Sequence, residues 1–190
     1  MEAFLVSTGI VALAEIGDKT QLLALVLATR LKKPLPICLG IFVATLLNHA
    51  CAAAVGQWIT TYIGPDAMRW ILGISFIAMA GWMLIPDKLD DDEGTKQQRF
   101  GAFLTTLIAF FIVEMGDKTQ IATVALAAKY VNLTAVVAGT TAGMLLANVP
   151  VVYFGDKLIK IVPLKIVHAV CALIFVLLGL AALLNLGGMS

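Results

Sequence analysis

Two nearly identical heptapeptides carry most of the candidate chemistry in this sequence. Glu15–Gln21 reads EIGDKTQ and Glu114–Gln120 reads EMGDKTQ, and the two copies start 99 residues apart. Each lies in an otherwise apolar stretch, and together they hold four carboxylates and two lysines. Carboxylate and amide oxygens suit hard or borderline divalent ions such as Ca²⁺, Mg²⁺ and Mn²⁺, and the sequence has no His/Cys cluster to favour Zn²⁺ or Cu⁺. The motifs therefore predict a site for a divalent cation.

The acidic residues of the motifs are the predicted metal ligands: Glu15, Asp18, Glu114 and Asp117. A Glu and an Asp three residues apart share one face of a helix, so two such pairs on facing helices would form an oxygen-rich pocket. Each motif lysine follows its Glu by four residues, which is a spacing at which the two side chains pair well on a helix.

The charge of the motifs predicts what could be exchanged there. A charge near the bilayer centre costs about 2.5–3.5 kcal/mol, so six of them left uncompensated would cost on the order of 15–20 kcal/mol. Four acids and two lysines leave a net charge of −2. One divalent cation would neutralise it, and in its absence protons could do so instead. We therefore expect one divalent cation to exchange for about two protons.

Other polar residues are predicted to support the ion from nearby positions. The glutamines would either bind the ion or hydrogen-bond the residues that bind it. The threonines would have a structural role, by bonding their own backbone carbonyls. The asparagines would either line the pocket or join helices by hydrogen bonds. The one histidine among them is either a proton relay or a core histidine with its hydrogen bonds satisfied. These supporting candidates are Lys19, Thr20, Gln21, Lys118, Thr119, Gln120, Asn48, His49 and Asn148.

The composition defines the class of protein. The 190-residue chain is 61% hydrophobic and 13% charged, and its mean hydropathy of +0.98 is typical of an integral membrane protein. Its net charge is only +1, without a basic patch interleaved with aromatic residues, which argues against nucleic-acid binding. The three cysteines, Cys38, Cys51 and Cys171, lack metal-ligand spacing and are predicted to be structural.

Six apolar stretches are predicted to span the membrane as helices. Each is near or above the roughly 20 residues that a spanning helix needs, although the third is short, and none alternates like a strand of a β-barrel. The predicted fold is an all-α integral membrane protein with six transmembrane helices. Their approximate ranges are 3–29, 35–62, 70–85, 100–128, 135–154 and 166–186.

The second half of the sequence repeats the first. A shift of 99 residues aligns Gly40 with Gly139 as well as the two heptapeptides. Because each half has three spans, an odd number, the halves are predicted to be inverted repeats. The predicted organisation is one transmembrane domain made of a first repeat, 1–85, a charged linker, 86–99, and a second repeat, 100–190.

The repeat also predicts where the site and the termini lie. Inverted-repeat transporters bind substrate near the bilayer midplane, often at interrupted helices, and Gly17 and Gly116 mark where such interruptions are expected. Nine lysines and arginines fall in loops on one side of the six spans, against Arg69 and Lys129 on the other. The bias predicts a cytoplasmic linker and both termini on the non-cytoplasmic side.

Both motifs resemble the signature E-x-G-D-[KR]-[TS] of a cation/proton exchanger family catalogued as uncharacterised protein family 0016. The likeness covers essentially the whole chain, because that family also has two three-helix repeats with one motif each. Its members transport Mn²⁺ or Ca²⁺, and the chain is most similar to bacterial manganese exporters of the MneA type. The resemblance implies proton-driven Mn²⁺ efflux across a bacterial inner membrane, with Glu15, Asp18, Glu114 and Asp117 binding the ion.

The resemblance implies a transporter and not an enzyme, and it implies no cofactor besides the transported Mn²⁺ or Ca²⁺ and protons. Several alternatives stay open at this point. The exchanger could prefer Ca²⁺, since both ions accept oxygen donors. The same acidic residues could line a cation channel. A small organic solute could be the substrate, or the protein could be purely structural.

Overall fold

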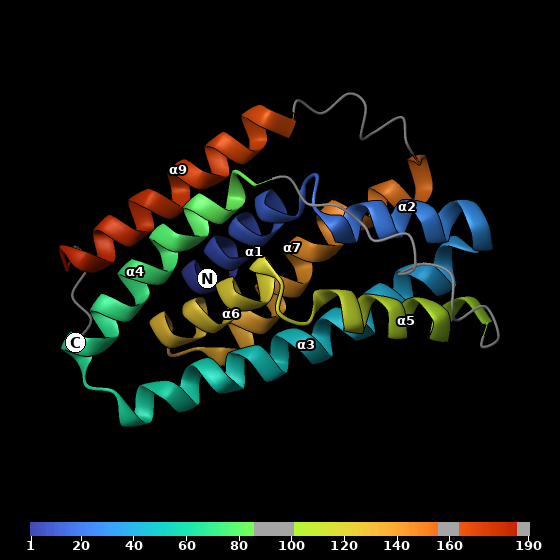
Figure 1. The fold of residues 1–190 in the computed structure, drawn as a ribbon. Helices are drawn as coiled ribbons and strands as arrows, with labels where there is room; N and C mark the ends of the chain where they lie inside the picture. The colour runs from blue at the N-terminus through green and yellow to red at the C-terminus, as the bar shows by residue number, and fades with distance from the viewer. Residues whose placement is uncertain (86–100, 156–163, 186–190) are drawn as a thin grey trace.

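The protein folds entirely into helices wherever its structure is described. This computed structural model describes residues 1–85, 101–155 and 164–185, and the predicted linker 86–99 lies outside them. The eight helices within these ranges form one elongated bundle (Figure 1). They are α1 Glu2–Glu15, α2 Lys19–Leu31, α3 Pro34–Tyr62, α4 Pro65–Met83, α5 Gly101–Glu114, α6 Lys118–Lys129, α7 Leu133–Phe154 and α9 Leu164–Leu183.

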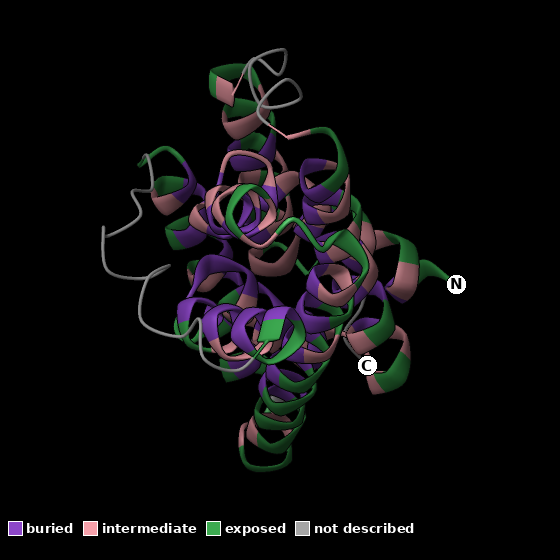
Figure 2. Ribbon diagram, turned by 90° about the vertical axis from the view of Figure 1, so that its right-hand side faces the viewer, coloured by how far each residue is buried: buried purple, intermediate pink, exposed green. Residues whose placement is uncertain are grey.

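Three of these helices, α3, α7 and α9, are long and apolar enough to cross a membrane by themselves. Helix α4 is similar in length, with 19 residues, but Asp66 and Arg69 near its start lower its mean hydropathy. Buried residues gather inside the bundle and exposed ones on its outside (Figure 2). The exposed side chains include many large apolar ones, such as Leu39 of α3 and Leu177 of α9, as expected of helices that face lipid. The all-helical membrane class predicted from the sequence is confirmed.

The first and fourth apolar stretches are each two helices and not one. The chain leaves the helical conformation between α1 and α2 and again between α5 and α6, at the glycine of each motif. Gly17 has a φ of 84° and Gly116 a φ of 77°, in the left-handed region that glycine adopts without a steric penalty. The interruptions expected at these glycines are therefore present. Asp18 and Asp117 are extended residues that immediately precede the second helix of each pair.

The two halves of the sequence are interleaved. The contacts of α1 are mainly with α7, and those of α3 with α5, α6 and α7, so the long helix of each half lies against the broken helix of the other. Close approach depends on glycine: a Cβ on Gly40 would lie 2.7 Å from Thr106, and one on Gly139 would lie 2.9 Å from Ser7. These two contacts join positions that the 99-residue shift makes equivalent. In both halves, small residues thus allow the helices to approach each other closely.

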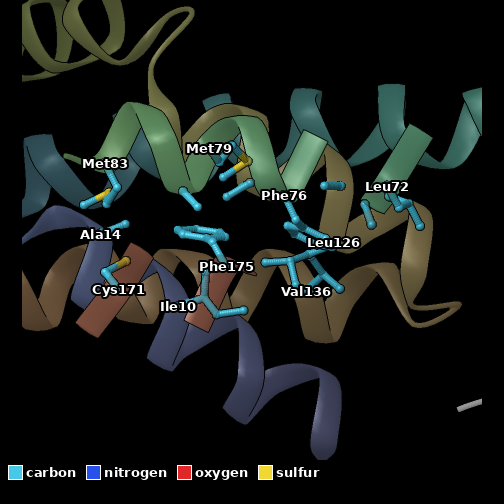
Figure 3. Packing of buried hydrophobic residues seen from close by; sticks show 14 of the residues in the cluster. Ile10, Ala14, Leu72, Phe76, Met79, Met83, Leu126, Val136, Cys171 and Phe175 are labelled. Carbon is cyan, nitrogen blue, oxygen red and sulfur yellow. The ribbon is translucent and has the colours of Figure 1, made fainter. Parts of the chain in front are cut away.

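Two apolar clusters hold the bundle on either side of the helix breaks. One is built mainly from α2, α3, α5 and α7 and also includes Val11 of α1. The other is built mainly from α1, α4, α6 and α9 and also includes Ala53 of α3 and Val136 of α7. In the second cluster, Phe76 of α4 stacks on Phe175 of α9 with the ring centroids 6.1 Å apart (Figure 3). The motifs therefore begin where one apolar core ends and the other starts. All three cysteines are free thiols, and Cys171 belongs to the second cluster.

Candidate functional site

At each helix break, the glutamine of the same motif accepts a hydrogen bond from the backbone. The backbone N–H of Gly17 donates to Gln21 Oε1 over 2.9 Å, and that of Gly116 donates to Gln120 Oε1 over 2.7 Å. The Gln21 amide also donates to the carbonyl of Ala147 on α7, at 3.1 Å. The amide oxygens considered as ligands thus accept hydrogen bonds from the backbone at the breaks, which fixes the direction in which α2 and α6 leave.

Because the helices break, the expectation that Glu and Asp of one motif share a helical face is wrong. Glu15 is the last residue of α1, and Asp18 precedes the first residue of α2 with extended φ and ψ angles of −79° and 168°. Asp117 has the same conformation, with φ and ψ of −79° and 166°. Neither aspartate side chain caps its helix. The positive ends of α2 and α6 nevertheless favour negative charge at these positions.

Three of the four predicted ligands come together. One carboxylate oxygen each from Glu15, Asp18 and Asp117 lies within 4.8 Å of the other two, and all three residues are buried. Two oxygens on opposite sides of a single Ca²⁺ are about 4.6–5.2 Å apart, since each bond is about 2.3–2.6 Å long. The spacing of the three carboxylates therefore fits one cation. The cluster draws on both motifs, Asp117 coming from the second.

Glu15 keeps part of its capacity to bind a cation. Its Oε2 accepts a hydrogen bond from the Thr20 hydroxyl and another from Asn148 Nδ2 at 3.3 Å. Thr20 therefore donates to the motif carboxylate of Glu15. The bond to its own backbone carbonyl, which is expected for an unbroken helix, is not the one that it makes. Glu15 Oε1 and Asn148 Oδ1 are buried without a hydrogen-bond partner among the described residues. Buried oxygens of this kind are costly unless something binds them, and a cation bound by Glu15 Oε1 would satisfy that atom.

Glu114 lies outside the three-carboxylate cluster and has its own partners on α3. Its Oε2 accepts hydrogen bonds from Thr45 and Asn48, each at 3.4 Å, and His49 Nε2 is 2.8 Å from its Oε1. His49 and Glu114 are both fully buried. Each motif glutamate thus contacts an asparagine of a long helix from the opposite half, Asn148 for Glu15 and Asn48 for Glu114.

The motif lysines pair across the halves. Lys118 Nζ is 3.4 Å from Asp18 Oδ1, and Lys19 Nζ is 3.8 Å from Asp117 Oδ1. The continuous helix that would bring each lysine beside the glutamate four residues before it is interrupted. Each lysine instead contacts the aspartate of the other motif.

The remaining polar contacts include two side chains that sequence reasoning did not place at the site, Thr45 and His168, and one that it did, Thr119. Thr45 stands one helical turn before Asn48, so its spacing could have indicated it. His168 has its Nε2 2.9 Å from the carbonyl of Ile16 at the first break. No rule of sequence spacing predicts the contact between His168 and Ile16. Thr119, a predicted supporting residue, donates to Asp117 Oδ2 at 3.5 Å.

Comparison with known proteins decides the family. The model of the family described as "Divalent cation/proton antiporter GDT1" matches residues 3–91 and again residues 102–190. The chain belongs to this family. The two matches start 99 residues apart, as the two heptapeptides do. Because the family consists of transporters, the protein is a transporter and not an enzyme, and the predicted resemblance is confirmed.

Relatives of this GDT1 protein occur in bacteria and plants. A protein of Vibrio cholerae serotype O1 named "Putative manganese exporter" is 52% identical over 95% of this chain and 90% of its own length. The Arabidopsis thaliana "GDT1-like protein 5" is 30% identical over 97% of this chain and 96% of its own length. The Oryza sativa "GDT1-like protein 3" is 25% identical over 92% of this chain and 71% of its own length. No solved structure matches the chain.

Proposed function

We propose that this protein exports Mn²⁺ from the bacterial cytoplasm in exchange for protons. The observation that carries the proposal is the cluster of Glu15, Asp18 and Asp117, whose oxygens lie within 4.8 Å of one another and come from both motifs. Its donors are all oxygens, the ligand type that Mn²⁺ and Ca²⁺ accept. Glu114 joins the proposed site as the fourth negative charge, held by Asn48 and His49.

The charge balance supports exchange. Lys118 and Lys19 each pair with a motif aspartate, so the net charge of −2 corresponds to the two glutamates when His49 is neutral. A divalent cation brings the site to neutrality, and two protons do the same. Either form crosses an apolar region at lower cost than the charged empty site. The site would therefore switch between facing the cytoplasm and facing the other side of the membrane when it holds either a divalent cation or two protons.

The proposed architecture is a pair of inverted three-helix repeats. Residues 1–85 and 100–190 would form the repeats, with the linker 86–99 in the cytoplasm and both termini on the other side of the inner membrane. The interrupted helices at Gly17 and Gly116, and the reciprocal contacts of the long helices, support it. In transporters of this kind the ends of half-helices meet the substrate near the midplane, where we place the site.

Manganese is favoured over calcium by one relative. The Vibrio cholerae protein that is 52% identical to this chain carries manganese in its name, whereas the oxygen donors of the site accept both ions. Calcium is therefore the competing ion in the transport assay described below.

Growth of a bacterial strain lacking its manganese exporter tests the proposal. The wild-type protein should restore growth on high Mn²⁺, and Glu15→Gln, Asp117→Asn and Glu114→Gln should not. Asp66→Asn, which removes an acid near the start of α4, is the matched control and should rescue fully. Rescue by the site variants equal to that of the wild type would refute the site.

Proteoliposomes test the coupling. A pH gradient should drive Mn²⁺ movement by the wild-type protein, and a protonophore should abolish it. Flux independent of any proton gradient and far faster than carrier turnover would show a channel instead. Excess Ca²⁺ that fails to reduce Mn²⁺ flux would establish selectivity for Mn²⁺.

A further inference from the structure

We propose that Lys19 and Lys118 are built-in competitors of the transported cation. Each ammonium group neutralises the aspartate of the opposite motif in the empty site and gives it up when the metal binds. The inference rests on the proposed function, since it requires that Asp18 and Asp117 bind the substrate ion.

The first step is the position of the two ammonium groups. Lys118 Nζ is 3.4 Å from Asp18 Oδ1, and Lys19 Nζ is 3.8 Å from Asp117 Oδ1. Both aspartates belong to the cluster whose oxygens, with one from Glu15, lie within 4.8 Å of one another. The lysines therefore approach the same carboxylates that a metal ion would bind.

The second step is that ion and ammonium repel each other there. A divalent ion bound to Asp18 and Asp117 would be about 2.0–2.6 Å from their oxygens and only a few ångströms from both ammonium nitrogens. Both aspartates are 2% exposed, so little solvent screens the repulsion. Metal binding and the present lysine pairing are therefore alternatives.

The third step concerns what the pairs connect. Each pair joins the start of α2 to the start of α6, and so links the broken helix of one half to that of the other. A metal ion shared by Asp18 and Asp117 would make the same connection by itself. The lysines thus stand in for the ion when it has left, and their return helps to expel it.

The two lysines should contribute unequally. The Lys118 side chain is 3% exposed and the Lys19 side chain 24% exposed. Charge is less screened at the buried position, so Lys118 should oppose the ion more strongly. Replacing Lys118 is accordingly the sharper test, and Lys19 offers a second variant with a smaller expected effect in the same direction.

The test is a titration of Mn²⁺ into the purified full-length protein in detergent, by isothermal calorimetry. Lys118→Gln should lower the dissociation constant for Mn²⁺ at least about tenfold, because a positive charge beside the ion is gone. Lys118→Arg keeps the charge and can hold Asp18 through two hydrogen bonds, so its dissociation constant should equal or exceed the wild-type value. In proteoliposomes, Lys118→Gln should show a lower KM for Mn²⁺ together with a lower maximal rate, because release becomes slow.

Binding by the wild-type protein separates the two proposals. Wild-type protein that binds no Mn²⁺, or binds it no better than Glu15→Gln, would defeat the proposed function. Wild-type binding that depends on Glu15, together with unchanged or weaker binding by both Lys118→Gln and Lys19→Gln, would overturn the competitor role alone. If Lys118→Gln does not elute as a single folded species in size-exclusion chromatography, Lys19→Gln decides the direction by itself.

Discussion

His49 and Asn148 occupy equivalent positions in the two halves, 99 residues apart, yet they hold the motif glutamates differently. His49 places an imidazole nitrogen 2.8 Å from Glu114, whereas Asn148 places an amide nitrogen 3.3 Å from Glu15. The two halves, which repeat in sequence, therefore differ in the polar groups that contact their motif glutamates. Thr20 completes the contacts of Glu15, and Thr45 and Asn48 those of Glu114.

Replacing His49 by Asn should slow transport while leaving the fold intact. The shorter amide does not reach Glu114 as the imidazole does, so the buried carboxylate oxygen that lies 2.8 Å from His49 Nε2 loses this contact. We expect the maximal rate of Mn²⁺ transport in proteoliposomes to fall about tenfold or more. Cys51→Ala, an exposed position of the same helix, is the control and should transport normally. An unaltered rate in His49→Asn would show that the imidazole is dispensable.

Alanine at the two motif glycines should destabilise the protein to different extents. Both positions have positive φ, which costs a residue with a Cβ roughly 1–2 kcal/mol. At Gly17 the added Cβ would also meet Leu164 at 2.7 Å, whereas nothing lies within 4 Å of it at Gly116. Gly17→Ala should therefore lower the thermal unfolding temperature in detergent more than Gly116→Ala. Gly64→Ala, with negative φ and open space, should change it little, and equal losses in all three variants would contradict the role of the backbone conformation.

Methionine at the two motif glutamines should likewise give unequal losses. Gln21 accepts from the Gly17 N–H and donates to the Ala147 carbonyl, so Gln21→Met removes both contacts. Gln120→Met removes one contact, with the Gly116 N–H at the exposed surface of the bundle. We expect Gln21→Met to cost about 1–3 kcal/mol of stability and Gln120→Met less. A chemical-denaturation series in mild detergent would measure both, and the reverse order would count against this account of the breaks.

The tyrosine between α6 and α7, Tyr130, should lose its proton only at high pH. Burial raises the pKa of Tyr130 to about 12, and the Glu2 carboxylate, 3.2 Å from its hydroxyl, adds to the rise. Glu2→Gln keeps a hydrogen-bond acceptor but removes the charge, so the pKa of Tyr130 should fall toward its usual value. Ultraviolet absorbance of tyrosinate against pH measures this, and Tyr130→Phe identifies the titration step. A Glu2→Gln curve that overlays the wild type would show that the charge has no influence.

Sequence reasoning succeeded where the relevant geometry is local. Hydropathy predicted an all-helical membrane protein. The glycines at positions 17 and 116 predicted the interruptions, because glycine adopts positive φ without a steric penalty wherever it stands. Side-chain pairing failed at the same points. The rule that joins Glu15 to Lys19 holds only on a continuous helix, and once Gly17 turns the chain, the partner of Lys19 is Asp117 of the other half. His168 beside Ile16 has no sequence signal, since only tertiary packing joins residues 152 positions apart.

The close contacts at Gly40 and Gly139 bear on whether either half could stand alone. Each long helix packs closely against the broken helix of the other half. One half by itself would leave that surface of its long helix uncovered, so the two halves depend on each other for their packing.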